Sequence, residues 1–97
     1  MATLIKTDGT KQIVHPANKR KFTYDELIEL IGGNCELLEW VSFYDGRTMF
    51  LDDFGKFNGQ PFNLEASKEF LSALGTVDPI MGNVVILSEK ECNYRLK

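Results

Sequence analysis

The spacing of apolar and polar residues divides the chain into short elements, the first of which is a predicted β-hairpin. Two β-prone runs, Thr3–Thr7 (TLIKT) and Lys11–Val14 (KQIV), flank Asp8-Gly9. Tight hairpin turns need positive φ, and glycine supplies it without strain. His15-Pro16 ends the second strand, because proline cannot donate to a strand ladder.

A helical pattern follows from Phe22 to Gly33. Thr23 and Glu26 have the spacing of a capping box, in which each side chain satisfies a backbone N–H of the other residue. Gly32-Gly33 provides a left-handed stop. One face is apolar at positions i, i+3, i+4 and i+7, which are Tyr24, Leu27, Ile28 and Ile31. A helix this short is stable only when it docks onto another element.

The next two runs form a second predicted hairpin. Cys35–Tyr44 (CELLEWVSFY) and Arg47–Asp52 (RTMFLD) flank Asp45-Gly46, which repeats the turn chemistry of the first hairpin. Cys35–Tyr44 carries large apolar side chains at both odd and even positions. Because the two sets face opposite sides of a sheet, we expect this strand to be central, with its second face partly covered or partly exposed.

The remaining residues predict a loop, a helix and a strand. Asp53–Phe62 is rich in turn residues, Asn63 caps a helix that runs to Leu74, and Asn83–Leu87 is an apolar run typical of a buried strand. The element order is β-β-α-β-β-α-β. This order predicts an α+β fold, with an antiparallel or mixed sheet of about five strands and two helices packed on one face.

Composition agrees with one small globular domain. The chain has 97 residues, of which 43% are hydrophobic and 26% are charged. No apolar run approaches the roughly 18–20 residues that a membrane helix needs, and the N-terminus lacks the apolar block of a signal peptide. We therefore expect a soluble, cytoplasmic protein with no membrane partner.

Charge is distributed unevenly along the chain. The net charge is −3, but residues 1–22 contain five basic side chains and one acidic side chain, a net +4. Residues 23–97 contain six basic and thirteen acidic side chains, a net −7. An acidic total argues against binding to duplex nucleic acid, because phosphate neutralisation drives that affinity. The local basic patch is compatible with a small anionic ligand or an acidic partner surface.

No catalytic, metal or cofactor motif is present. His15 is the only histidine and has no metal-ligand partners at short spacing, although a nucleophilic pair with Cys35 or Cys92 stays an alternative. The two cysteines are interpreted as reduced thiols, with Cys35 half-buried in a strand and a disulfide as the alternative. Asp52-Asp53 is interpreted as the opening of a turn, since adjacent strand residues point to opposite faces. The glycines fit turns and caps, not a phosphate-binding loop.

Aromatic residues are concentrated in the middle of the chain. Seven fall within 23 residues: Trp40, Phe43, Tyr44, Phe50, Phe54, Phe57 and Phe62. They either fill the single core or leave some rings exposed as a pocket or interface. Aromatic faces beside basic groups suit a nucleotide, with stacking for the base and charge for the phosphates. The basic triplet Lys19-Arg20-Lys21 is either such a site or a solvated loop.

Three stretches together resemble a family of small uncharacterised domains that occurs in bacteriophages, plasmids and other mobile elements. They are the helix and strand LIELIGG and CELLEWV, the segment FLDDFGKFNGQPFNLEAS, and the ending DPIMGNVVIL, which span residues 22–88. Asp53, Gly55, Pro61 and Asn63 match the turn and helix start of that pattern, whereas the basic triplet and the aromatic excess lie outside it. The resemblance implies an accessory protein of a phage or mobile element and carries over no catalytic residue.

Such accessory proteins often act stoichiometrically against host defences, so we hypothesise a non-enzymatic binder in the host cytoplasm. In the first version it sequesters a nucleotide-derived immune signal, with phosphates and base held by His15, Lys19, Arg20, Lys21, Trp40, Tyr44, Phe54 and Phe57. A homo-oligomer is compatible with this version, because small domains often build pockets at symmetric interfaces. In the second version the acidic face inhibits or regulates a host defence nuclease or another host protein. A third is an interaction module without a defence role.

Overall fold

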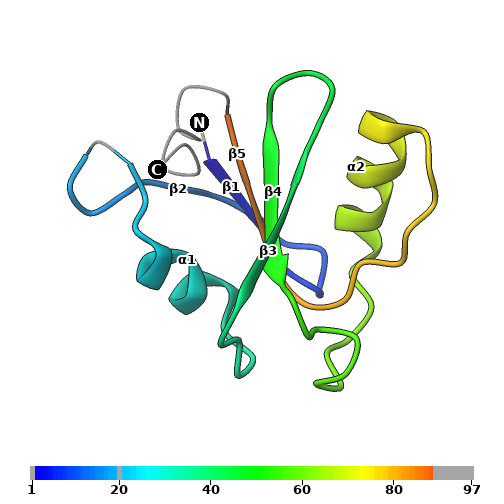
Figure 1. The fold of residues 1–97 in the computed structure, drawn as a ribbon, viewed down its shortest axis with the longest axis horizontal. Helices are drawn as coiled ribbons and strands as arrows, with labels where there is room; N and C mark the ends of the chain where they lie inside the picture. Colours follow the sequence, from blue (N-terminus) through cyan, green and yellow to red (C-terminus); the bar gives the residue numbers. More distant parts are fainter. Residues whose placement is uncertain (1, 20, 89–97) are drawn as a thin grey trace.

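The computed structural model describes residues 2–19 and 21–88, which form a single antiparallel sheet with two helices (Figure 1). The strands are β1 (Ala2–Ile5), β2 (Lys11–Val14), β3 (Leu38–Ser42), β4 (Thr48–Asp52) and β5 (Val84–Leu87). The helices are α1 (Tyr24–Ile31) and α2 (Leu64–Leu74). The predicted α+β class and the element order are confirmed. The strand order across the sheet is β2-β1-β5-β4-β3, with all neighbours antiparallel.

The two helices cover opposite faces of the sheet, which corrects the expectation that both pack on one face. Figure 1 shows the sheet between α1 on its left and α2 on its right. Leu27 of α1 belongs to a core cluster with Val85, whereas Phe70 of α2 belongs to a second cluster with Val84. The physical reason is β5, in which all four residues are apolar and buried. A strand that is apolar on both faces needs a cover on each.

Strand β3 lies at the edge of the sheet, so the expectation of a central Cys35–Tyr44 strand is wrong. Strand β5 enters between β1 and β4, and the β3–β4 hairpin is left with β3 on the outside. Of the large apolar groups that suggested a central position, Leu38 is buried but Trp40 is 48% exposed. Cys35 is buried in the loop before β3, not half-buried in a strand. Its proposed partner Cys92 lies outside the described residues.

The capping box of α1 has the predicted contacts. The Glu26 amide donates to Thr23 Oγ1 at 3.1 Å, and the Thr23 amide donates to Glu26 Oε1 at 2.9 Å. Glu26 Oε2 accepts a further bond of 2.8 Å from the Ala17 amide. These backbone donors lower the pKa of Glu26. At the sheet, the Tyr24 hydroxyl accepts from the Leu38 amide at 2.8 Å, which links α1 to β3.

Asn63 connects α2 to two other segments. Its Oδ1 accepts from the Ala66 amide at 3.0 Å, as expected of an N-cap. Its Nδ2 donates to the carbonyls of Ile5 at 3.0 Å and Gly82 at 2.8 Å. The residue is completely buried. One side chain therefore joins the start of α2 to the end of β1 and to the segment that enters β5.

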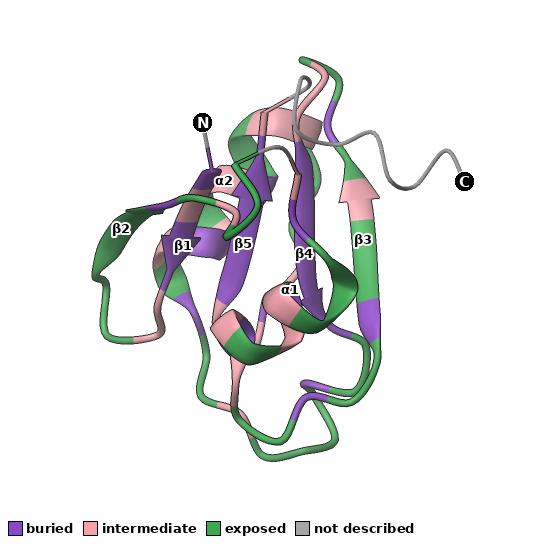
Figure 2. Cartoon of the chain, turned by 90° about the vertical axis from the view of Figure 1, so that its left-hand side faces the viewer, coloured by how far each residue is buried: buried purple, intermediate pink, exposed green. Residues whose placement is uncertain are grey.

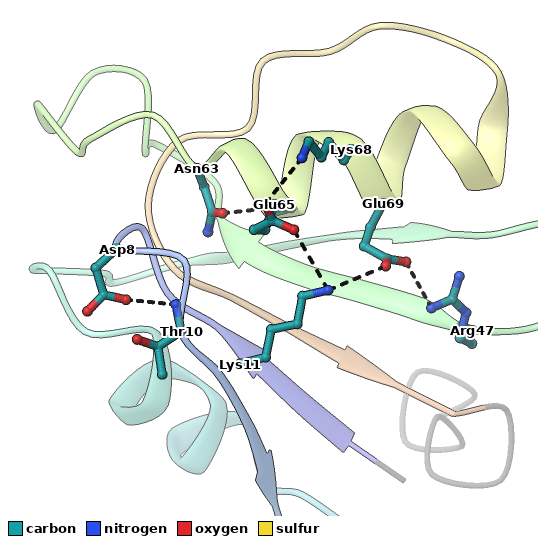
Figure 3. A network of polar contacts seen from close by, with 9 residues as sticks. Asp8, Thr10, Lys11, Arg47, Asn63, Glu65, Lys68 and Glu69 are labelled. Atoms are coloured by element: carbon teal, nitrogen blue, oxygen red, sulfur yellow. Dashed lines mark hydrogen bonds and ion pairs between the residues drawn. The ribbon is translucent and has the colours of Figure 1, made fainter.

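Ion pairs hold α2 against the sheet (Figure 3). Lys11 of β2 lies 3.8 Å from Glu65 and 4.0 Å from Glu69. Arg47, at the β3–β4 turn, lies 3.3 Å from Glu69 and 2.9 Å from Asp45. The acidic side of α2 thus pairs with cations from β2 and from the β3–β4 turn.

We expect Asn63→Ala to lower the free energy of unfolding by about 2–4 kcal/mol, because it removes the helix cap and the two buried side-chain hydrogen bonds to the Ile5 and Gly82 carbonyls. Asn63→Asp separates these roles. It keeps an acceptor for the Ala66 amide but places a carboxylate against the carbonyls of Ile5 and Gly82. Urea denaturation should show Asn63→Asp at least as destabilised as Asn63→Ala. Recovery of most of the stability by aspartate would show that only the cap matters.

Candidate functional site

A cleft of about 270 Å³ opens on the α2 side of the sheet, between edge strand β3, the loop after β4 and the segment before β5. Its walls come from elements that are far apart in the sequence. The floor is apolar and consists of Val41, Leu51, Phe70, Ile80 and Met81. Strand β4 and helix α2 therefore give the cleft a rigid base.

The rim of the cleft is acidic. It carries Glu39 from β3, Asp53 from the next loop and Asp78 from the segment before β5, with Lys56 as the one basic side chain. Lys56 Nζ lies 3.1 Å from Asp78 Oδ1. Partial burial, and then the charges of Asp53 and Asp78, raise the pKa of Glu39 above its ordinary value of 4.5. The fold thus holds like charges together at this point.

Asp52 fixes the loop that forms one wall of the cleft. Its Oδ1 accepts from the Phe54 amide at 2.9 Å, and its Oδ2 accepts from Asn58 Nδ2 at 3.0 Å. The expectation that Asp52-Asp53 opens a turn is confirmed. Asp52 is itself buried, whereas Asp53 is exposed at the rim, so the two adjacent carboxylates have separate roles. Asp52 positions the loop and Asp53 contributes charge.

Cysteine and metal chemistry find little support within the described part of the chain. Burial and the nearby Asp52 carboxylate raise the pKa of the Cys35 thiol to about 11, and its Sγ donates to the Leu37 carbonyl at 3.5 Å. Such a thiol is protonated at neutral pH and a poor nucleophile. Among residues 2–19 and 21–88, no three His, Cys, Asp or Glu side chains are placed to hold a metal ion.

The predicted basic site lies far from this cleft. His15 and Lys19 are exposed in the loop between β2 and α1, and Lys21 is partly buried there. The Lys21 amide donates to Asn18 Oδ1 at 3.1 Å. Arg20 lies outside the described residues. This loop begins at β2, the edge of the sheet opposite β3.

The predicted aromatic residues are exposed and come from β3, its turn and the loop after β4, whereas the basic loop follows β2. Trp40 is in β3, Tyr44 is at the β3–β4 turn, and Phe54 and Phe57 are in the loop after β4. Figure 2 shows the exposed edges β2 and β3 on either side of the buried strands β1, β5 and β4. These edges are four interstrand spacings apart, or about 19 Å. Of the predicted site residues, Phe57 alone appears among those that line the acidic cleft.

Of the two alternatives for the seven aromatic residues, the structure shows the one in which some rings stay exposed. Phe43 and Phe50 are buried, whereas the other five are between 45% and 85% exposed: Trp40, Tyr44, Phe54, Phe57 and Phe62. Phe62 belongs to a second hollow of about 290 Å³, lined by apolar groups of α2 and the following segment. Asp78 and Pro79 line both hollows. An acidic cleft and an apolar groove therefore share one wall.

Sequence reasoning missed the acidic rim residues Glu39, Asp53, Lys56 and Asp78 as a group. A signal was present in the net −7 of residues 23–97. A second signal was Glu39, a charged residue inside an otherwise apolar strand sequence. Neither signal predicts that Asp78 lies next to Glu39, because their proximity depends on the position of β5 in the sheet.

The fold and the cleft define a small α+β domain with an acidic hollow beside an edge strand. No helix in the described part of the chain is long and apolar enough to cross a membrane. Residues 1–95 match the model of the family described as domain of unknown function DUF3846, so the chain belongs to this family. Comparison with curated proteins and with solved structures found no match. The resemblance to a small uncharacterised domain family is thereby confirmed.

We expect Glu39→Gln to raise the free energy of unfolding at neutral pH by a few tenths of a kcal/mol, on the scale of exposed charge pairs. The pKa of Glu39 is raised in the folded state, so its ionised form opposes folding. The gain should shrink as the pH falls through the folded pKa, and vanish below the ordinary value of 4.5, where the carboxyl is protonated in both states. Urea denaturation of both proteins across this pH range measures the difference in their free energies of unfolding.

Glu29→Gln on the exposed side of α1 is the matched control, with the same change of charge on the opposite face of the sheet. An equal gain in both variants would assign the effect to net charge alone. A loss of stability in Glu39→Gln would show that its carboxylate is held by favourable contacts.

Proposed function

We propose that this domain is a non-enzymatic protein-binding module whose acidic cleft receives basic side chains of a partner protein. This is the second of the three functional hypotheses drawn from the sequence. The resemblance to phage and mobile-element proteins supplies the setting: an accessory protein that inhibits or regulates a host protein.

The observation that carries the proposal is the composition of the cleft. Three carboxylates and one ammonium surround an apolar floor. Lysine and arginine side chains fit such a hollow, because their stems bury against apolar groups while their charged ends reach carboxylates. Partial burial, and then the charges of Asp53 and Asp78, raise the pKa of Glu39, and an incoming cation would offset both effects. Perturbed carboxylates in a cleft are a common mark of functional sites.

The surroundings of the cleft favour a protein over a small cation. Leu64, Leu71 and Val77 are 54%, 45% and 77% exposed beside the groove that shares Asp78 and Pro79 with the cleft. Contiguous exposed apolar groups next to a polar site are typical of protein interfaces. A partner could cover the groove while its basic residues occupy the cleft.

The geometry gives less support to sequestration of a nucleotide-derived signal. That hypothesis needs cations and aromatic rings in one site, whereas the basic loop leaves the β2 edge and the predicted aromatic residues lie in β3, at its turn or in the loop after β4. Phe57, the predicted ring that lines the cleft, shares it with Glu39, Asp53 and Asp78, whose carboxylates repel phosphate. Nucleotide binding at a site shared between two copies stays a prediction.

We expect a short capped peptide rich in lysine and arginine to shift the amide NMR signals of Glu39, Asp53 and Asp78 at low salt. The double variant Glu39→Gln/Asp53→Asn should weaken binding by roughly tenfold or more, because it leaves only Asp78, which already pairs with Lys56. Added salt should weaken binding to the unsubstituted protein, since the rim is exposed to solvent.

The double variant Asp25→Asn/Glu29→Gln on α1 makes the same change in net charge on the opposite face and should bind as the unsubstituted protein does. Equal weakening of peptide binding in both double variants would show that only the overall charge matters. Shifts confined to the loop of Lys19 and Lys21 on addition of a cyclic dinucleotide or ADP-ribose, with none from the peptide, would replace this proposal with the nucleotide hypothesis.

A further inference from the structure

Strand β3 is an outer strand of the sheet beside the acidic cleft. Among the described residues, β3 pairs with β4 on one side and with no strand on the other. The Phe43 amide donates to the Arg47 carbonyl at 2.7 Å, and the Asp53 amide donates to the Leu37 carbonyl at 2.9 Å. Backbone groups alternate in direction along an antiparallel strand. The backbone amides and carbonyls of the odd-numbered residues of β3 therefore point toward β4, and those of Trp40 point outward.

The two edges of the sheet differ in how they are protected. Natural edge strands are commonly blocked by lysine, proline or a covering segment. Strand β2 starts at Lys11 and is followed by Pro16, whereas the sequence of β3, LEWVS, contains neither residue. One end of β3 is closed, because the Leu38 amide is bonded to the Tyr24 hydroxyl. Within residues 2–19 and 21–88, no strand pairs with the middle of this edge, around Trp40.

The two sides of β3 have different chemistry. Glu39 and Val41 face the cleft on the α2 side. Trp40 faces the α1 side, where its ring lies 6.2 Å from that of Phe50 and is still 48% exposed. A strand added next to β3 would place alternate side chains on these two sides. Its residues on the cleft side would meet carboxylates, and those on the other side would meet the Trp40 ring.

We propose that the partner binds by adding an extended segment to the edge of β3, with lysine or arginine entering the cleft and apolar residues packing on Trp40. Binding of this kind combines main-chain hydrogen bonds with a pocket for alternate side chains. The inference rests on the proposed function and specifies the shape of the partner. Charge favours a basic partner segment over the β3 strand of a second copy of this chain, because pairing two copies there would bring two acidic rims together.

Trp40 is the only tryptophan, so its fluorescence reports directly on the proposed contact. The test uses the full chain and two peptides of equal composition. One alternates lysine and valine, and the other has its lysines and valines in separate blocks. We expect the alternating peptide to change Trp40 fluorescence, protect the Trp40 amide from hydrogen exchange, and bind at least roughly tenfold more tightly than the blocked peptide.

Backbone N-methylation of the alternating peptide tests the hydrogen bonds without altering its charge. Methyl groups on the amides that face β3 should weaken binding by roughly tenfold or more, whereas methyl groups on the opposite edge should leave affinity nearly unchanged. Glu39→Gln should weaken the alternating peptide severalfold and keep the Trp40 response, because the edge remains.

The outcomes separate this inference from the proposed function. If both peptides bind equally and N-methylation has no effect on either edge, strand addition is wrong while the acidic cleft still binds basic groups. If neither peptide binds, both are wrong. If light scattering shows a peptide-free dimer in which the Trp40 amide is already protected, the edge is occupied by a second copy, and the inference is overturned.

Discussion

The hydrogen bonds of the Asn63 side chain are the contacts on which the remainder of the structure depends. One buried amide caps α2 and holds the carbonyls of Ile5 and Gly82. These three points come from the end of β1, the start of α2 and the approach to β5, so the side chain lies where β5 joins the sheet beside β1. Asn83 does the same for the other helix: it accepts from the Thr7 amide at 3.0 Å and donates to the Ile31 carbonyl at 3.1 Å.

The position of β5 determines where the proposed binding surface lies. By pairing with both β1 and β4, β5 becomes the centre of the sheet and leaves β3 outermost. The segment that leads into β5 brings Asp78 and Ile80 against the loop after β4, and so completes the cleft. The cleft therefore stands on buried residues of β4, α2 and the segment before β5, while one wall of it is an exposed edge. A rigid base with an open side suits recognition of an extended segment.

Local chemistry explains why much of the fold could be predicted from the sequence. The Thr23 and Glu26 capping box, the Asn63 cap and the two Asp-Gly turns act over a few residues, so their patterns can be identified without knowing the tertiary structure. The strand order could not be predicted in this way, because it depends on contacts such as that between Asn63 and Ile5. The apolar run Val84–Leu87 signalled burial on both faces, but only the structure shows that the two helices supply it.

Pairing of charges within the chain distinguishes the two sheet edges more clearly than the charge counts do. The basic N-terminal residues and the acidic remainder suggest a molecule with two complementary ends. Lys11 at the β2 edge is, however, already close to Glu65 and Glu69 of α2. At the β3 edge, three carboxylates line the cleft with Lys56 as the one cation, which pairs with Asp78. Partial burial and the charges of Asp53 and Asp78 raise the pKa of Glu39 there. This group of carboxylates lies at the edge where the outward backbone groups of Trp40 also lie. Two independent features, electrostatic and backbone, thus favour the same edge as the place where another chain binds.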